Sequence, residues 1–334
     1  MPKSQEYTDC LELIQELHSN DSRFESIAMR VFKYQYTHNP LLKQYAQLVS
    51  KTPEKISALE DIPFLPIEFF KGHRVQTGKW KEKLIFESSG TTGKHPSRHY
   101  VRSIDNYIET TTRHFEERFG NLEELVILAL LPSYLERQNS SLVKMVEEFI
   151  IGSDDPLSGF YMYNFKTLSE TLKTCMTANK EVVLIGVSFA LVDFAEQYPM
   201  QLENIRIVET GGMKGRKKEM TREELHGFLK TQFKMLQIDS EYGMTELFSQ
   251  AYMTNGTAFV SAPTMRVLAT EVNDPLNIIY QKTGRLAIID LANIDTCSFI
   301  QTNDLGVCYD NNTFQVLGRV DDSDTRGCNL LYVN

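Results

Sequence analysis

An alternation of short apolar segments with helical segments, running from about Lys83 to Gln232, constrains the fold more than any other feature of the sequence. Parallel strands need a long crossover between them, usually a helix, so this alternation is typical of a mostly parallel, helix-covered sheet. The predicted strands are residues 125–131, 181–186, 205–209 and 235–238, and the predicted helices are residues 103–119, 142–151, 168–178, 189–197 and 218–232. The predicted fold class is therefore α/β.

The segments on either side of this alternation have a different character. In residues 1–60 the apolar side chains recur at a spacing close to that of a helix, and a connector with Pro63 and Pro66 follows. After Thr245 the predicted strands are shorter and are separated by Asn, Asp and Gly turns, which indicates a small β lobe. These strands are residues 258–260, 265–270, 284–291, 298–301 and 314–317.

The charge balance and the apolar runs exclude two classes of partner. The 334 residues carry 35 Lys and Arg against 44 Asp and Glu, a net charge of −9, whereas a nucleic-acid binder needs a basic surface. The longest apolar run, residues 125–131, is much shorter than the ~20 residues that cross a bilayer. Residues 1–20 hold no signal-peptide core. We therefore expect no nucleic-acid partner, no membrane span and a cytoplasmic location.

A loop rich in glycine and hydroxyl side chains occupies residues 86–97, with the sequence Phe-Glu-Ser-Ser-Gly-Thr-Thr-Gly-Lys-His-Pro-Ser. Its backbone N–H groups and hydroxyls suit a polyphosphate, and Lys94 adds a positive charge. It is not a Walker A loop, because Ser88 stands where that motif needs glycine and His95 where it needs Ser or Thr. An isolated run of this kind is more often a flexible loop, so the segments downstream decide between the two readings.

Three short motifs follow in order: Glu-Tyr-Gly-Met-Thr-Glu at residues 241–246, Thr-Asn-Asp-Leu-Gly at 302–306 and Gly-Arg-Val-Asp-Asp at 318–322. Together with the loop they resemble the adenylate-forming superfamily, which makes acyl-AMP from ATP and a carboxylate. Within it, the loop, Glu-Thr-Gly-Gly-Met-Lys-Gly at 209–215 and Arg-Gly-Cys-Asn-Leu at 326–330 are closest to the acyl-protein synthetases. These are the long-chain fatty acid ligases of the bacterial fatty-acid reductase and their relatives.

The resemblance implies ATP and Mg²⁺ as cofactors, and it assigns roles to the matched residues. Thr245 would bond the α-phosphate, and Glu246 would offer an oxygen ligand to Mg²⁺. Asp304 and Arg319 would bind the ribose. The β- and γ-phosphates would contact Ser88, Ser89, Gly90, Thr91, Thr92 and Gly93, and the adenine would lie against Gly211, Gly212 and Tyr242. Without the ordered set, Glu246 would be read as a solvated carboxylate and Asp304 as a turn former.

The sequence departs from the superfamily in its phosphate loop. A lysine usually follows the loop proline closely, whereas Pro96 is followed here by Ser97 and Arg98. The missing positive charge would come from Lys94, Arg98 or Lys214, and the sequence leaves this choice open. Of these, we assign Lys94 to catalysis.

The resemblance also gives meaning to the C-terminus. Five cysteines, spread along the chain with no C-x-x-C pair, predict neither a disulfide framework nor a zinc site. Superfamily enzymes continue past the hinge arginine into a lid domain, which we expect to be absent here or reduced to a tail. Acyl-protein synthetases carry the acyl group on a cysteine near the C-terminus, which implies Cys328 as the acyl carrier. The expected domains are a helical region (1–82), an ATP-dependent adenylating core (83–318) and a tail (319–334).

Gly-Val-Ser-Phe-Ala at residues 186–190 follows a strand and precedes a helix, as the nucleophile Ser188 of a hydrolase would. The order of a triad then leaves only His226, which lies on a predicted helix too soon after Ser188, so a strand-to-helix turn with Ser188 as cap is the better interpretation. Two alternatives remain open. An acyl-CoA ligase of the phenylacetate-CoA ligase type shares the phosphate loop. A non-catalytic nucleotide- or acyl-binding relative would keep the fold alone. For the substrate, Val187 and Phe189 suggest an apolar pocket compatible with a fatty acid, and the implied partner is an acyl reductase.

Overall fold

The computed structural model describes residues 5–19, 21–88, 96–132, 139–211, 220–254, 256–309 and 312–320. By their contacts these residues form two compact units, Lys81–Ala262 and the combination of Met1–Trp80 with Pro263–Asn334. The first division falls close to the expected end of the helical region at residue 82. The second falls inside the expected core, since the residues from Pro263 onwards group with Met1–Trp80.

The unit Lys81–Ala262 is built on a parallel sheet. Its strand order is β8-β7-β6-β4-β5, with β9 and β10 added antiparallel beside β8. Every residue of β4 is buried, as expected of a strand covered on both faces. The strands are β4 (Leu125–Leu130), β5 (Gly159–Phe160), β6 (Glu181–Val187), β7 (Ile205–Thr210), β8 (Asp239–Tyr242), β9 (Ala251–Met253) and β10 (Phe259–Ser261).

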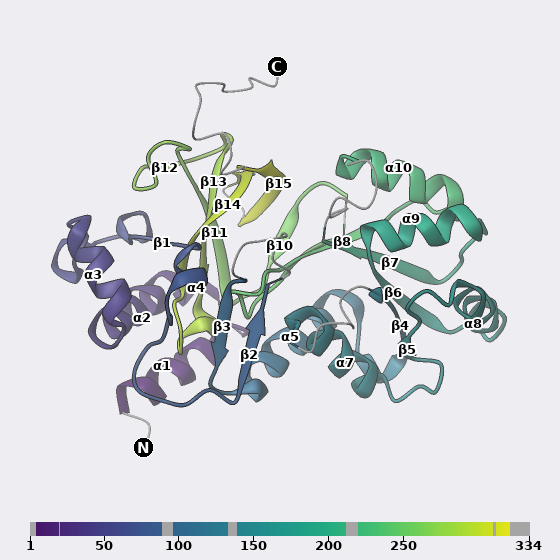
Figure 1. The fold of residues 1–334 in the computed structure, drawn as a ribbon, viewed down its shortest axis with the longest axis horizontal. Coiled ribbons are helices and arrows are strands. Elements are labelled where there is room, and N and C mark those ends of the chain that lie inside the picture. The colour runs from purple at the N-terminus through teal and green to yellow at the C-terminus, as the bar shows by residue number, and fades with distance from the viewer. Residues whose placement is uncertain are drawn as a thin grey trace. The chain divides into compact units, whose positions relative to one another are not determined.

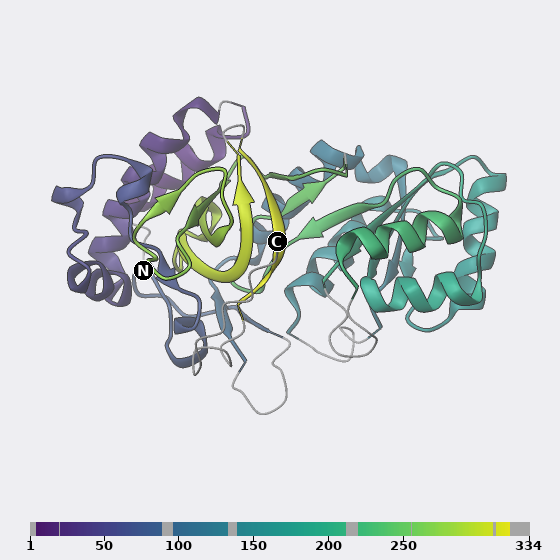
Figure 2. The same ribbon diagram turned by 90° about the horizontal axis from the view of Figure 1, so that it is seen from above.

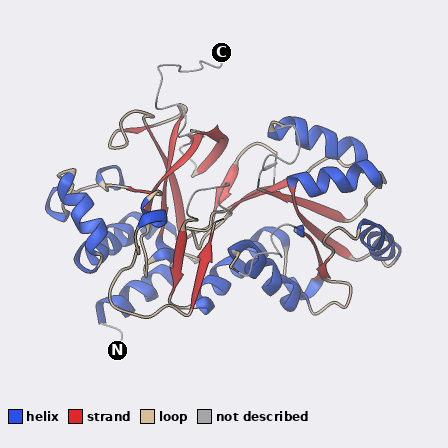
Figure 3. Cartoon of the chain, in the orientation of Figure 1, coloured by secondary structure: helices blue, strands red, loops and turns tan. Residues whose placement is uncertain are grey.

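Helices cover both faces of this sheet. In Figure 1, α9 and α10 lie over one face and α5 and α7 over the other. Figure 3 shows the same view with helices and strands in different colours. The chain reverses direction after β5, since β4 leads outward to the edge strand and β6 leads back towards β7 and β8. The helices are α5 (Ile104–Phe119), α7 (Ser141–Ser153), α8 (Phe165–Thr177), α9 (Ser188–Gln197) and α10 (Arg222–Phe233).

A separate hairpin in this unit carries the glycine-rich loop. Strand β2 (Leu84–Glu87) pairs antiparallel with β3 (Arg98–Val101), and Phe86 lies opposite His99. Residues 88–97 therefore connect two paired strands, and α5 begins directly after the second of them.

The other unit combines N-terminal helices with an antiparallel sheet of order β12-β11-β13-β14-β15. Strand β1 pairs parallel with β14. In Figure 2 the purple helices lie beside the yellow-green strands. The elements are α1 (Gln5–Glu16), α2 (Phe24–His38), α3 (Pro40–Leu48), β1 (Leu65–Pro66), α4 (Phe69–Gly72), β11 (Met265–Thr270), β12 (Ile278–Ile279), β13 (Gly284–Asp290), β14 (Phe299–Cys308) and β15 (Thr313–Arg319).

Buried contacts explain why chain segments so far apart join in one unit. The Phe32 ring meets Phe299 edge to face at 5.6 Å. The buried Gln35 amide donates to the carbonyls of Asn293 and Ile294 and accepts from the Ser298 N–H. Because a buried amide left without partners would be costly, these bonds fix α2 against the segment before β14.

One predicted strand is wrong. Residues 235–238 are not a strand; β8 begins at Asp239, and Leu236 is 97% exposed. The cause is that β8 buries polar side chains, Asp239 and Ser240, so a search for apolar runs selects the preceding segment. The other predicted strands are confirmed to within two residues, except that residues 298–301 cover only the start of β14, which continues to Cys308. Thr221 and Glu224 form a capping box at the start of α10. No helix in the described ranges is both long and apolar enough to cross a bilayer.

Candidate active site

The candidate site lies at the carboxyl ends of β6, β7 and β8 in the unit Lys81–Ala262. In open parallel sheets, ligands bind outside the carboxyl ends of the strands. The residues that follow the three strands are Ser188, Gly211 and Gly243. Two of the motifs found in the sequence, residues 209–215 and 241–246, therefore start from neighbouring strands.

Two of the three residues predicted to hold the adenine, Gly211 and Tyr242, lie at this edge. Thr210 of β7 lies opposite Glu241 of β8, so Gly211 and Tyr242 are next in line on the two strands. Gly211 has φ +71°, a conformation that favours glycine. Tyr242 is buried, and its ring lies 5.9 Å from Phe259. The register of the two strands therefore brings the Gly211 backbone and the Tyr242 ring close together.

The base of the glycine-rich loop is closed by two serines. The Ser88 N–H donates to the Ser97 carbonyl at 3.1 Å, and the Ser97 N–H donates to the Ser88 hydroxyl oxygen at 2.9 Å. Ser88 thus helps to hold the two ends of the loop together. The remaining loop residues of the prediction lie outside the described residues: Ser89, Gly90, Thr91, Thr92, Gly93 and Lys94.

One of the three candidate cations is engaged. Arg98 Nε lies 3.1 Å from Glu87 Oε1, across the β2–β3 pair. This ion pair competes with a phosphate for the guanidinium of Arg98. Lys94 and Lys214 lie outside the described residues.

The turn after β8 is attached to the hairpin. The Nδ1 of His99 lies 2.8 Å from the carbonyl oxygen of Thr245, and His99 is wholly buried. Burial lowers the pKa of His99 to about 4, so the ring is neutral near pH 7. A carbonyl oxygen only accepts, so Nδ1 carries the hydrogen. Glu246, the next residue, is 5% exposed.

A cluster of buried polar groups supports the end of β7. The Glu209 carboxylate lies 3.1 Å from the Ser188 hydroxyl, 3.5 Å from Arg222 Nε and 3.7 Å from His226 Nε2. Burial opposes ionisation of Glu209, but the interactions with His226 and Arg222 outweigh it and lower the pKa of this carboxyl. Glu209 is therefore an anion held two residues before Gly211.

The next strand carries a second carboxyl, Glu241, whose pKa is displaced in the opposite direction. Burial, and then the negative charge of Glu209, raise the pKa of Glu241 to about 7, although Thr210 donates a hydrogen bond that acts the other way. A Cβ added at Gly243 would lie 2.4 Å from Glu241 Oε1. Glycine at this position therefore leaves room for the Glu241 carboxyl under the turn.

The arrangement does not match a hydrolase triad. The Ser188 hydroxyl points to Glu209 and to the carbonyl of Gly211, whereas His226 Nε2 lies 3.2 Å from the Ser240 hydroxyl. A triad needs the nucleophile on one nitrogen of the imidazole and the acid on the other. Here Nε2 faces both Ser240 and Glu209, and Ser188 acts at the start of α9 as a link to β7.

The predicted ribose pair lies in the other unit. Asp304 of β14 and Arg319 of β15 are opposite each other in the strand register, with Arg319 Nε 3.7 Å from Asp304 Oδ1. The Arg319 side chain is 61% exposed and that of Asp304 is 15% exposed. The two side chains predicted to contact one sugar are therefore neighbours.

The cysteines fall into two groups. Cys10, Cys175, Cys297 and Cys308 are buried. Burial raises the pKa of all four thiols, to about 12 for Cys297 and Cys308, which makes them poor nucleophiles. Cys328, like Gly212, lies outside the described residues.

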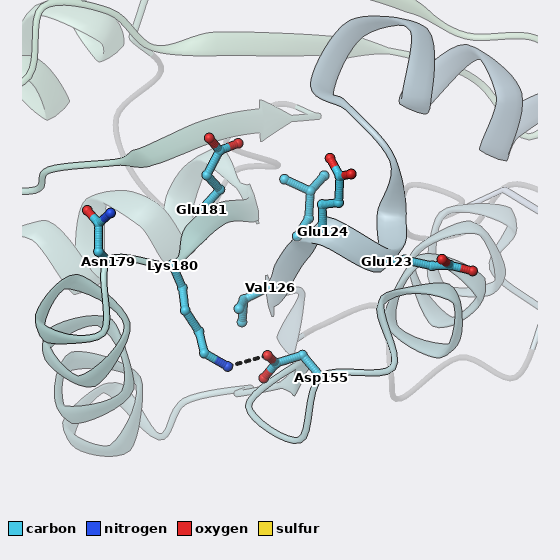
Figure 4. Close-up of a pocket in the computed structure, with 8 residues that line it drawn as sticks. Glu123, Glu124, Val126, Asp155, Asn179, Lys180 and Glu181 are labelled. Carbon is cyan, nitrogen blue, oxygen red and sulfur yellow. Dashed lines mark hydrogen bonds and ion pairs between the residues drawn. The ribbon is translucent and has the colours of Figure 1, made fainter.

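A polar hollow of about 410 Å³ lies at the opposite edge of the sheet. It is formed where β4 and β6 begin, and Figure 4 shows Lys180 and Asp155 joined in an ion pair across it. Carboxylates from Glu123, Glu124 and Glu181 also line it. The motif residues lie at the carboxyl ends of the strands, so this hollow is separate from the candidate site.

Comparison with solved structures identifies the class of fold. The chain aligns with an open conformation of 2-hydroxyisobutyryl-CoA ligase in complex with 2-HIB-AMP and CoA, at a TM-score of 0.64 and 10% identity, over 89% of this chain and 70% of that one. It aligns with ATP-bound MatB from Rhodopseudomonas palustris at a TM-score of 0.53 and 13% identity, over 72% of this chain and 49% of that one. No curated protein matches its sequence. The α/β fold is that of the large domain of adenylate-forming ligases.

A family model then identifies the family to which the chain belongs. The model of acyl-protein synthetase, LuxE, matches residues 8–333. The chain therefore belongs to the acyl-protein synthetase family, and it is an AMP-forming ligase. The resemblance drawn from the ordered motifs is confirmed.

Sequence reasoning gave no role to three residues that the site contains: His99, Glu209 and Glu241. The two carboxyls had a recognisable signal, because each is an acidic residue in a strand next to a glycine motif. His99 had none, since its partner is 146 positions away.

Proposed function

We propose that the protein activates a carboxylic acid of the fatty class with ATP and Mg²⁺, releases pyrophosphate, and transfers the acyl group from acyl-AMP to Cys328 for delivery to an acyl reductase. The observation that carries the adenylation is the join between His99 and Thr245. It attaches the turn after β8, which starts beside Gly211, to the hairpin that carries the phosphate loop. A nucleotide site needs these parts held together.

In the adenylation step, a carboxylate oxygen attacks the α-phosphorus, and the bond to the pyrophosphate oxygen breaks. Both reactants are anions, so the site must hold them in line and balance their charge. Gly211 and Tyr242 would take the adenine, the loop that starts at Ser88 would take the β- and γ-phosphates, and the Thr245 hydroxyl would bond the α-phosphate. Asp304 and Arg319 would contact the ribose.

The donor set fits Mg²⁺. Among the described residues no cluster of three His, Cys, Asp or Glu side chains is arranged to hold a metal. Mg²⁺ commonly needs no such cluster, because it binds one or two carboxylates together with substrate phosphates and water. Glu246 offers such a carboxylate, because it lies in the turn after β8, next to Thr245. When bound, Mg²⁺ would neutralise charge on the phosphates.

In the transfer step, the thiolate of Cys328 attacks the carbonyl carbon of acyl-AMP, the carbon–oxygen bond to the phosphate breaks, and AMP leaves. The burial of the four described cysteines supports this choice by elimination. Arg326 stands two positions from Cys328 in the sequence, and a positive charge close to the thiol would favour its thiolate form.

Two further points support the proposed acid and partner. Val187 ends β6 and Phe189 lies in the first turn of α9, and both are apolar and buried. An apolar surface next to them would suit an acyl chain better than a polar acid. A thioester on an enzyme cysteine needs an acceptor, and the family resemblance indicates a reductase.

The adenylation is tested by exchange of labelled pyrophosphate into ATP, with carboxylic acids of short, medium and long chain. We expect exchange that depends on the acid and on Mg²⁺ and is fastest with a long chain. Absence of exchange with every acid would leave only the non-catalytic alternative. Exchange that is fastest with a short or aromatic acid would refute the fatty class.

The transfer is tested by intact mass after incubation with ATP, Mg²⁺ and the best acid. We expect one hydroxylamine-labile acyl group, which Cys328→Ser removes while pyrophosphate exchange continues. The matched control is Cys175→Ala, at a buried thiol, which should keep the label. Persistence of the label in Cys328→Ser would refute the assignment, and formation of acyl-CoA instead would favour the CoA-ligase alternative.

A further inference from the structure

The buried histidine of the hairpin has a geometry that a packing role alone does not require. His99 lies in β3, two residues after Ser97 closes the phosphate loop, and its ring packs 4.9 Å from Phe248. Phe248 in turn contacts Tyr107, which packs on Phe86. An apolar ring would satisfy these contacts equally well. The additional feature is the hydrogen bond from Nδ1 to the Thr245 carbonyl.

Resting on the function proposed above, we propose that His99 is a positioning residue for adenylation: its Nδ1–H holds the carbonyl of Thr245 and thereby fixes the Thr245–Glu246 turn relative to the phosphate loop.

The bond joins two parts that must act on one triphosphate. The loop between Ser88 and Ser97 would hold the β- and γ-phosphates, whereas Thr245 would bond the α-phosphate. In-line attack depends on where the α-phosphorus lies relative to the leaving group, and an error of about 1 Å costs about 100-fold in rate. The Thr245 side chain can move only as far as its own backbone permits, so the bond to its carbonyl limits that error.

Burial makes the bond persistent. His99 is 0% exposed, and burial disfavours its charged form, so the ring stays neutral and keeps one N–H across the working pH range. Without this N–H the Thr245 carbonyl would face a wholly buried side chain that offers it no donor. Removal of the N–H should therefore displace the turn.

Two substitutions separate positioning from packing. His99→Phe keeps a ring for Phe248 and removes the donor. His99→Asn keeps an N–H donor at the δ position and removes the ring. In pyrophosphate exchange we expect His99→Phe to lower kcat by about 10- to 100-fold with less than a threefold change in the KM for ATP. We expect His99→Asn to recover most of kcat although its melting temperature is the lower of the two.

The matched control is His114→Phe. His114 is also 0% exposed and lies in α5 of the same unit, with Nδ1 3.3 Å from Glu117. It should retain kcat within about threefold whatever its effect on stability. The opposite order, with His99→Phe active and His99→Asn inactive, would identify His99 as a packing residue and overturn the proposal.

A measurement on the unmodified protein keeps the proposal falsifiable if a variant does not fold. With ¹⁵N-labelled histidine, NMR reports which ring nitrogen of His99 carries the hydrogen, and we expect Nδ1. The Nε2–H tautomer would exclude the donor and overturn the proposal. Wild-type protein without acid-dependent exchange would overturn the proposed function itself, whereas exchange in the wild type and unchanged kcat in His99→Phe would overturn only the role of His99.

Discussion

Replacing Glu241 with glutamine tests the electrostatics of the site directly. The Glu241 carboxyl accepts a hydrogen bond from Thr210 and lies next to Gly243, and burial together with the charge of Glu209 raises its pKa from 4.5 to about 7. Since one pH unit of difference corresponds to about 1.4 kcal/mol, the two values are separated by about 3 kcal/mol. Glutamine keeps the acceptor oxygen and removes the ionisation.

The raised pKa of Glu241 decides whether the free energy of unfolding rises or falls with pH. Below pH 4.5 the carboxyl is protonated in both the folded and the unfolded protein, so it adds no pH dependence. Between pH 4.5 and about 7 the unfolded chain releases the proton and the folded one keeps it, so the free energy of unfolding falls as pH rises. Above about pH 7 the loss is complete.

The assay is urea unfolding of wild type and Glu241→Gln between pH 4.5 and 8. We expect the wild type to lose about 3 kcal/mol more than the variant across this range. Hydrogen exchange at the amides of β8 should follow the same difference, because Glu241 lies in that strand. Parallel pH profiles for the two proteins would refute the reasoning, since they would mean that Glu241 is ionised in the folded state.

Three further substitutions test the site. Gly243→Ala places a Cβ 2.4 Å from Glu241 Oε1, so kcat/KM for ATP in pyrophosphate exchange should fall about 10-fold; an unchanged value would show that the carboxyl moves freely. Arg222→Met leaves the Glu209 carboxylate with fewer partners at 7% exposure, so urea unfolding should show a loss of about 1–3 kcal/mol, and equal stability would contradict the importance of the pair. Asp304→Asn should raise the KM for ATP about 10-fold with little change in stability, because its partner Arg319 is mostly exposed; a normal KM would exclude Asp304 from nucleotide binding.

The sequence determined the architecture because the relevant signals are local. Burial on both faces makes β4 apolar throughout, and the spacing of apolar residues marks the helices between strands. The ordered motifs identify the family for the same reason, because each motif is a short pattern in the sequence. The strand prediction failed at β8, because the polar residues Asp239 and Ser240 are buried there and no apolar run marks the strand.

Only the tertiary structure decided which distant residues meet and what state they adopt. The bond of His99 to Thr245 spans 146 positions, and the pairing of Gln35 with Ser298 spans 263. The opposite pKa displacements of Glu209 and Glu241 arise because two carboxyls on adjacent strands share one buried region, in which Arg222 and His226 stabilise the charge on the first. The distance between two groups and their desolvation depend on strand register and on packing. Register and packing cannot be predicted from the residues that are close in the sequence.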